Sequence, residues 1–316
     1  MIPSEKPHLK TAALTHPGMT GKNNEDRHAL FAFKPDPANG LGPVLLAVVA
    51  DGVGGKQAGE IAAETAVETI GRIAAESDGT DPLATMRRAY VESNRAILER
   101  AGEGFETSGM ATTATCAWIA GDRLYAANIG NSRLYLLRDG KLRRISIDHS
   151  WVEEALALGL ITPDQARDHP QARVITRHLG SKDPEPDLRI RLSPDDDDKT
   201  MKANQALRLL PGDSLLICSD GLSDVVSDPE IEAALNEDGL DPALARLTDL
   251  ANERGGPDNI TSIALRVPVN VRSEPEVQVK TETTGNRSRL SLYLLSTILL
   301  VILILIGWLF FLFFLQ

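Results

Sequence analysis

Apolar positions along most of the chain follow either helical or strand-like spacing. Residues 58–75 and 82–100 have apolar side chains at helical spacing, and the second stretch opens with a proline at a first-turn position. Apolar runs bounded by Gly-Asp or Asp-Gly pairs predict strands at 112–119, 123–128 and 133–137. Strands in runs and helices in pairs predict an α+β fold, with antiparallel sheets packed against outer helices.

The second half of the globular part continues this pattern. The predicted helices are 151–160, 229–235 and 242–254, and the predicted strands are 215–219 and 260–267. Four consecutive aspartates, 195–198, point in different directions, so we interpret them as a solvated loop.

The last part of the chain has a different composition. Residues 268–289 are polar and lack apolar periodicity, which predicts a linker. Residues 290–315 contain no charge and are almost wholly Leu, Ile, Val and Phe, long enough to cross the roughly 30 Å hydrocarbon core of a bilayer. Arg287 and Arg289 precede this run and indicate a cytoplasmic N-terminal end. We therefore expect a transmembrane helix that anchors a cytoplasmic domain to the lipid bilayer of the cell membrane.

Composition and charge narrow the class of protein. The chain has 316 residues, 42% of them hydrophobic, and a formal net charge of −11. This charge argues against nucleic acid as a partner, because nucleic acid requires a basic surface. The two cysteines, Cys116 and Cys218, lie in apolar strand-like runs, which predicts buried free thiols in a reducing compartment.

Four acidic motifs lie far apart in the sequence. They are Asn24-Glu25-Asp26, Ala50-Asp51-Gly52-Val53-Gly54-Gly55, Ser219-Asp220-Gly221-Leu222 and Gly256-Pro257-Asp258-Asn259. Asp51 and Asp220 each follow an apolar strand-like run, and neither is adjacent to Lys or Arg. A carboxylate at a buried strand end loses hydration and needs a partner. Converging carboxylates repel each other unless a cation lies between them, and hard divalent ions prefer such oxygen ligands.

The order and the residues of these motifs resemble those of the metal-dependent Ser/Thr protein phosphatases, the PPM or type 2C family, in their bacterial form. An Asp-Gly pair alone is common in turns, but the whole series stands in family order from Leu9 to Val267. The resemblance implies a phosphatase domain at 9–267 with a flap segment at 150–181. It also implies a four-layer α/β/β/α sandwich with metals at one edge. Further matches are Gly109-Met110-Ala111-Thr112-Thr113, Asn128-Ile129-Gly130-Asn131-Ser132-Arg133, Asp148-His149-Ser150, Val174-Ile175-Thr176-Arg177 and Leu179-Gly180.

The resemblance implies a site with two Mg²⁺ or Mn²⁺ ions. Asp51 would bridge the two ions, which activate a shared water and clamp the phosphoryl group. Glycine at position 52 lets its backbone carbonyl approach one ion. Glu25 and Asp26 would act mostly through bound water, since both metals commonly retain waters. The implied metal ligands are Asp51, Gly52, Asp220, Asp258, Asp26 and Glu25.

Three positions depart from the family pattern. Gly21 occupies the position at which relatives carry a phosphate-binding Arg. The next residue, Lys22, can supply a positive charge but cannot bind two phosphate oxygens at once as an arginine does. Val53 replaces the histidine that serves as general acid in many eukaryotic relatives. Asn131 replaces an aspartate that helps hold a third metal in relatives, which puts that third ion in question because Asn offers only a neutral oxygen.

The function implied by the resemblance is hydrolysis of phosphoserine and phosphothreonine in proteins, opposing Ser/Thr kinases at the cytoplasmic membrane face. The expected partners are phosphorylated proteins and Ser/Thr kinases. One alternative is a catalytically weak or inactive module that binds phosphoproteins; Gly21 and Asn131 favour it, whereas the intact acids favour the enzyme. A second, weaker alternative is a phosphatase for small phosphate esters, because a fold alone does not determine a substrate.

Overall fold

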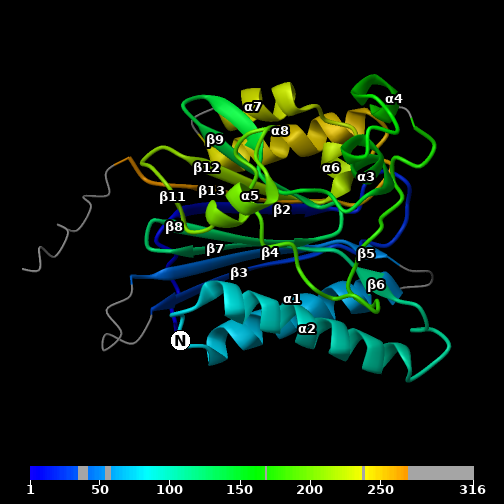
Figure 1. Cartoon of the computed structure of the whole chain (residues 1–316), viewed down its shortest axis with the longest axis horizontal. Coiled ribbons are helices and arrows are strands. Elements are labelled where there is room, and N and C mark those ends of the chain that lie inside the picture. Colours follow the sequence, from blue (N-terminus) through cyan, green and yellow to red (C-terminus); the bar gives the residue numbers. More distant parts are fainter. Residues whose placement is uncertain (35–41, 54–57, 168, 237–238, 270–316) are drawn as a thin grey trace, which may run out of the picture. The chain divides into compact units, whose positions relative to one another are not determined.

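Two antiparallel sheets lie face to face at the centre of the molecule, as Figure 1 shows. The computed structural model describes residues 1–34, 42–53, 58–167, 169–236 and 239–269. In spatial order, the first sheet contains β1 (Ile2–Pro3), β3 (Arg27–Lys34), β4 (Val44–Ala50), β7 (Ala114–Ala120), β8 (Arg123–Ile129) and β11 (Leu207–Arg208). The second contains β10 (Lys141–Arg144), β9 (Arg133–Arg138), β12 (Ser214–Cys218), β13 (Ile260–Arg266) and β2 (Lys10–His16).

Helices cover the outer face of each sheet (Figure 1). The first sheet is covered by α1 (Ala58–Glu76) and α2 (Pro82–Ala101), and the second by α7 (Asp228–Leu235) and α8 (Leu240–Glu253). The predicted α+β fold of two antiparallel sheets flanked by helices is therefore confirmed. Shorter helices lie in the connections: α3 (Trp151–Ala157), α4 (Pro163–Arg167), α5 (Asp198–Ala203) and α6 (Asp220–Ser223).

The central strand β4 explains why this layering positions Asp51. Every residue of β4 is buried. Its side chains alternate between the core under the helices, which contains Leu46 and Val48, and the core between the sheets, which contains Leu45 and Ala47. A strand covered on both faces appears in the sequence as a continuous apolar run. Asp51 is the first residue beyond it and therefore lies at one edge of both cores.

Several predicted elements differ in detail from the structure. The predicted strand 112–119 is interrupted at Thr113, because β6 (Ala111–Thr112) pairs separately with β5 (Gly52–Val53). The predicted solvated loop 195–198 is wrong in part, because two of its carboxylates are used locally. Asp197 caps α5, and Asp196 accepts two backbone N–H groups of the preceding loop.

The prediction that Cys116 and Cys218 are buried free thiols is confirmed. For the membrane prediction, none of the helices in the described part of the chain is both long and apolar enough to cross a bilayer. The predicted span 290–315 and almost all of the predicted linker 268–289 lie outside the described residues.

Candidate active site

The backbone of Asp51 is held on both sides by the Thr112-Thr113 pair. The Asp51 N–H donates to Thr113 Oγ1 at 3.0 Å. Its carbonyl accepts the Thr113 N–H at 2.8 Å and the Thr112 hydroxyl at 2.9 Å. These three bonds fix the Asp51 backbone just beyond the end of β4 and do not involve its carboxyl group.

A chain of hydrogen bonds leads from Asp51 to the second sheet. The hydroxyl groups of Thr113 and Ser132 lie 2.8 Å apart. The neighbouring Asn131 donates its side-chain N–H to Asp220 Oδ2 at 2.8 Å. Asp220 is the first residue of α6, which begins two positions after the end of β12. The motif around Asn131 therefore connects the two aspartates that end the central strands of the two sheets.

Asn259 and Ser219 bind the N-terminal acidic motif. Asn259 Oδ1 accepts the Glu25 N–H at 2.8 Å, and its amide N–H donates to the carbonyls of Pro17 and Asn23. The Ser219 hydroxyl donates to Asp26 Oδ2 at 2.8 Å. Both side chains are buried. The polar residues within the acidic motifs thus hold neighbouring motifs in place.

Glycine at two motif positions allows backbones to touch. A Cβ at Gly52 would lie 2.2 Å from the Gly59 carbonyl oxygen and 2.7 Å from that of Glu25. A Cβ at Gly221 would lie 2.0 Å from the Asn259 carbonyl oxygen. Any larger residue would force these segments apart. The structure thus brings Glu25, Asp26, Gly52, Asp51, Asp220 and Asp258 into one region.

Burial and mutual repulsion raise the pKa values of these acids. Burial is the largest cause at Asp51, whose pKa lies well above its ordinary value, and three neighbouring acids raise it further. Burial also raises the pKa of Asp26 to about 7, although hydrogen bonds with Thr261 and Ser219 oppose the shift. The carboxyl groups of Asp51 and Asp220 share a hydrogen bond. The carboxyl groups of this cluster therefore cannot all be ionised at once unless a cation binds among them.

Two cations lie at the rim of the cluster. Burial and the charge of Asp258 raise the pKa of Glu25, while Lys22, itself exposed, lowers it. Arg173 lies on the other side, where its Nε is 3.0 Å from Asp224 Oδ2. Its charge also lowers the pKa of Asp220, whose pKa is raised by burial.

Sequence reasoning located Lys22 but missed Arg173 and Asp224. Asp224 is four positions beyond Asp220, and its pKa is raised to about 6, chiefly by burial. Arg173 belongs to the flap segment, one residue before the matched Val174-Ile175-Thr176-Arg177 motif. The only sequence signal for Arg173 was its place in that segment, because nothing in the local pattern indicates a contact with an acid about fifty positions away.

The donor set fits a hard divalent ion by its chemistry. It consists of carboxylate oxygens with raised pKa values, together with a backbone that glycine makes approachable at position 52. The side-chain oxygen of Asn131 is buried and has no hydrogen-bond partner. Among the described residues, no three His, Cys, Asp or Glu side chains stand in a ready ligand arrangement. Asp51 and Asp220 instead share a hydrogen bond.

Comparison with known proteins identifies the family. The chain matches Protein phosphatase 2C over residues 19–263, most of its length. The chain belongs to the protein phosphatase 2C family. The region of that match begins just before Lys22 and ends within β13, so it includes the whole acidic cluster.

Two bacterial relatives illustrate the match to the phosphatase 2C family. The serine/threonine protein phosphatase PstP of Mycobacterium tuberculosis is 38% identical over 259 residues, which are 82% of this chain and 45% of PstP. This chain thus spans less than half the length of PstP. A putative protein phosphatase 2C-type of Streptococcus pyogenes is 35% identical over 258 residues, covering 80% of this chain and 95% of that protein.

Solved structures agree with this assignment. The crystal structure of M. tuberculosis PstP/Ppp has a TM-score of 0.69 at 35% identity, covering 82% of this chain and 99% of that one. The catalytic domain of PstP in complex with two manganese ions has a TM-score of 0.67 at 34% identity, covering 82% of this chain and 98% of that one.

The raised pKa values predict how stability changes with pH. An acid whose folded-state pKa exceeds its unfolded value binds more protons when folded, so its contribution to stability is lost as pH rises through the folded pKa. For Asp26 this window runs from 3.8 to about 7. In EDTA, we expect the Tm to fall by on the order of 5 °C between about pH 5.5 and about pH 8. Mn²⁺ should raise Tm more at the higher pH.

The Asp51→Asn variant is the control for this measurement by thermal unfolding. It removes one acid and leaves unchanged His8 and His28, whose pKa values burial lowers and which act in the opposite direction. Its Tm should depend less on pH in EDTA than that of the wild type. Equal pH dependence in both proteins would contradict the electrostatic account.

Proposed function

We propose that this protein removes phosphate from phosphoserine and phosphothreonine side chains of proteins, in a reaction that depends on Mg²⁺ or Mn²⁺. The observation that carries the proposal is the convergence of Asp26, Asp51 and Asp220, whose pKa values are all raised and whose charges need a cation. The proposal is further supported by relatives that are named Ser/Thr phosphatases and cover the same domain.

The residues that would hold the ions are Asp51, the carbonyl of Gly52, Asp220, Asp258, Asp26 and Glu25. When bound, two divalent ions supply an activated water and neutralise the phosphoryl oxygens. The task of the chain is to hold the carboxylates in place before substrate arrives. The bonds from Thr113 and Asn131 do this for Asp51 and Asp220, and those from Ser219 and Asn259 do it for the Asn24-Glu25-Asp26 segment.

Phosphate binding would rest on Lys22 and Arg173 together. Gly21 has no side chain to offer, and its φ of +72° turns the backbone in a conformation that favours glycine. Arg173 is 60% exposed, so its guanidinium is accessible to a ligand while Asp224 keeps it beside Asp220. A guanidinium can bind two phosphoryl oxygens at once, which an ammonium group cannot.

A phosphoprotein-binding module without turnover is the second candidate. Asn131 favours it, because its amide donates to Asp220 where relatives carry an additional carboxylate. The kinetic experiment on Asp51 below separates the two candidates.

We also propose that residues 290–315 anchor the protein in the cell membrane, with the catalytic domain in the cytoplasm. The support is the sequence itself, an uncharged apolar run preceded by Arg287 and Arg289. In this position the phosphatase would oppose Ser/Thr kinases at the membrane face.

Asp51→Asn should abolish hydrolysis of a phosphothreonine peptide in saturating Mn²⁺, with kcat reduced at least about a thousandfold. The neutral amide removes the carboxylate that would bridge the ions, while its shape preserves packing. Asp139→Asn is the matched control, because Asp139 is exposed in the β9–β10 turn at a φ of 52°, which Asn tolerates. Turnover by Asp51→Asn above about a tenth of the control would rule out the two-metal account.

The same assay tests the second candidate function. A wild-type protein that binds the peptide without hydrolysing it would establish the binding module.

Arg173→Ala and Lys22→Ala should each raise KM for the phosphopeptide about tenfold and lower kcat less, because they remove ground-state contacts with the phosphate. Arg173→Lys should recover only part of the loss, since it lacks the bidentate fork. Lys182→Ala, an exposed cation just beyond the flap segment, is the control and should leave KM unchanged. An unchanged KM in Arg173→Ala would assign phosphate binding to other groups.

Deleting residues 290–316 should move the protein from the membrane fraction to the soluble fraction without loss of activity, because every residue of the acidic cluster precedes the deletion. Fractionation and protease protection measure this directly. Full-length protein in the soluble fraction, or a domain protected on the outer side, would show that the anchor proposal is wrong.

A further inference from the structure

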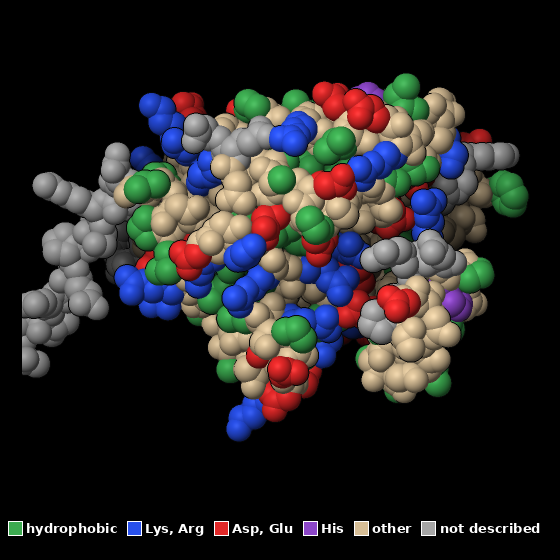
Figure 2. Space-filling view, turned by 90° about the horizontal axis from the view of Figure 1, so that it is seen from above, with side chains coloured by type: hydrophobic (Ala, Val, Ile, Leu, Met, Phe, Trp, Pro, Cys, Tyr) green, Lys and Arg blue, Asp and Glu red, His purple; other side chains and the backbone are tan. Residues whose placement is uncertain are grey.

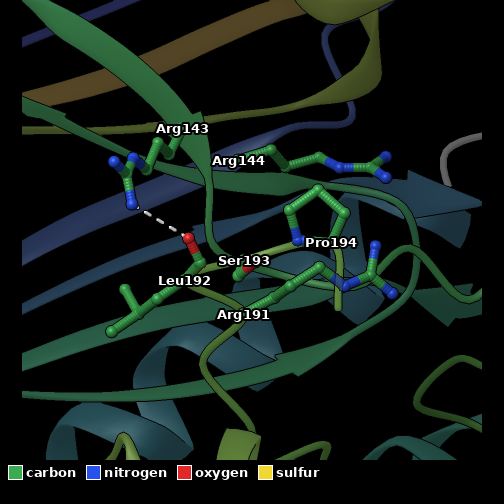
Figure 3. Close-up of a pocket in the computed structure, with 6 residues that line it drawn as sticks. All are labelled: Arg143, Arg144, Arg191, Leu192, Ser193 and Pro194. Carbon is green, nitrogen blue, oxygen red and sulfur yellow. Dashed lines mark hydrogen bonds between the residues drawn. The ribbon is translucent and has the colours of Figure 1, made fainter. Parts of the chain in front are cut away.

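A second cluster of cations lies apart from the acidic site. Arginines of β10 face the loop 191–194 across an open cavity of about 390 Å³. Figure 3 shows the Arg143 side chain turned to one side, where it reaches the Leu192 carbonyl. The side chains of Arg144 and Arg191 extend to the other side, past Pro194. Three arginines thus line this cavity, together with Leu192, Ser193 and Pro194.

The loop that forms one wall is held rigidly. Asp196 Oδ2 accepts the backbone N–H groups of Leu192 and Ser193 at 2.8 and 3.0 Å, and it also accepts the Asn204 amide at 3.2 Å. The Asp196 carboxylate is therefore occupied with the backbone of its own loop. The wall is fixed before any ligand binds.

Among the described residues, two of the three lining arginines are paired with acids and the third is not. Glu153 bonds to both Arg144 and Arg191 at 2.8 Å, and Asp148 also bonds to Arg144. Arg143 is exposed, and within the described residues its only hydrogen bond is to the Leu192 carbonyl, with no carboxylate partner. Figure 2 shows Lys and Arg side chains gathered at the centre of one face of a molecule whose net charge is −11.

Ion pairs connect this cavity to the catalytic region. Asp148 Oδ2 binds Arg144 at 3.0 Å and Arg133 at 2.8 Å, and Arg133 follows the Asn131-Ser132 pair. Glu153 lies in α3, the first helix of the flap segment. The arginines of the cavity therefore contact the flap segment through Glu153. They are also linked through Asp148 to Arg133, which lies two positions after Asn131.

We propose that this arginine-lined cavity binds an acidic or phosphorylated side chain of the protein substrate, at a position away from the phosphoresidue that is hydrolysed. Guanidinium groups match the planar geometry of carboxylates and the tetrahedral geometry of phosphates. Arg143 is the group without an acidic partner, and the walls formed by Leu192 and Pro194 suit the aliphatic stem of a side chain. The proposal rests on the proposed phosphatase function. It predicts that the enzyme prefers protein substrates that carry an additional anionic residue near the phosphoresidue.

The test compares a set of phosphothreonine peptides in which one glutamate is moved along an otherwise neutral sequence. Wild type should show a lower KM for at least one glutamate position, and Arg143→Gln should lose about fivefold of that preference. Arg88→Gln is the control, because Arg88 is an exposed arginine of α2, in the helical layer on the opposite side of the sandwich. It changes the net charge equally and should keep the preference.

The small ester p-nitrophenyl phosphate separates failure of this proposal from failure of the proposed function. It cannot span two sites, so all three proteins should hydrolyse it at equal rates. If the wild type does not hydrolyse it in Mn²⁺, the phosphatase function itself fails. If the wild type hydrolyses it but shows no glutamate preference, or if both variants lose the preference equally, the cavity proposal is overturned. Inorganic phosphate tests a further outcome. If it slows the wild type and Arg88→Gln but not Arg143→Gln, and no peptide preference is found, the cavity binds a free anion. That result would also overturn the proposal.

Discussion

Mutual repulsion among buried carboxylates is the constraint on which the rest of this structure depends. Asp51 and Asp220 lie just beyond the ends of β4 and β12, strands of two different sheets, so the sandwich itself brings two desolvated acids together. Such an arrangement is unstable unless a cation or protons neutralise it. The two strands are nevertheless held together, because separating the sheets would expose the apolar core that lies between them.

The polar residues of the motifs fix the positions of the acidic segments. Thr113, Ser132, Asn131, Ser219 and Asn259 join segments that are distant in sequence, and all of them are buried. They hold backbone and carboxylates by neutral hydrogen bonds, which add no charge to an already acidic region. Lys22 and Arg173 place positive charge at the exposed rim of this region. The motifs thus separate two tasks, fixing the acids and leaving them available to cations.

Local sequence patterns predicted the regular elements well. The helix predicted at 58–75 is Ala58–Glu76, and the helix predicted at 82–100 is Pro82–Ala101, whose start is fixed by the Asp81 cap. The strand predicted at 112–119 failed at Thr113, because that residue bonds to Asp51 instead of continuing a ladder. The prediction of a solvated loop at 195–198 was wrong in part for a different reason: Asp196 and Asp197 accept hydrogen bonds from backbone N–H groups three or four positions away. Thr113 thus has a partner distant in sequence, whereas the two aspartates have local ones.

The sequence by itself allowed us to predict candidate metal ligands, because acids next to glycine at the ends of apolar runs are recognisable from residue type and order alone. It also determined the fold class, since apolar periodicity reports which faces must be buried. Only the tertiary structure decided which cations meet which acids. Arg173 reaches Asp224, and Arg143 faces a cavity without an acidic partner among the described residues, through contacts between segments far apart in the chain. Long charged side chains at the surface have no periodicity, so their partners follow from packing and not from pattern.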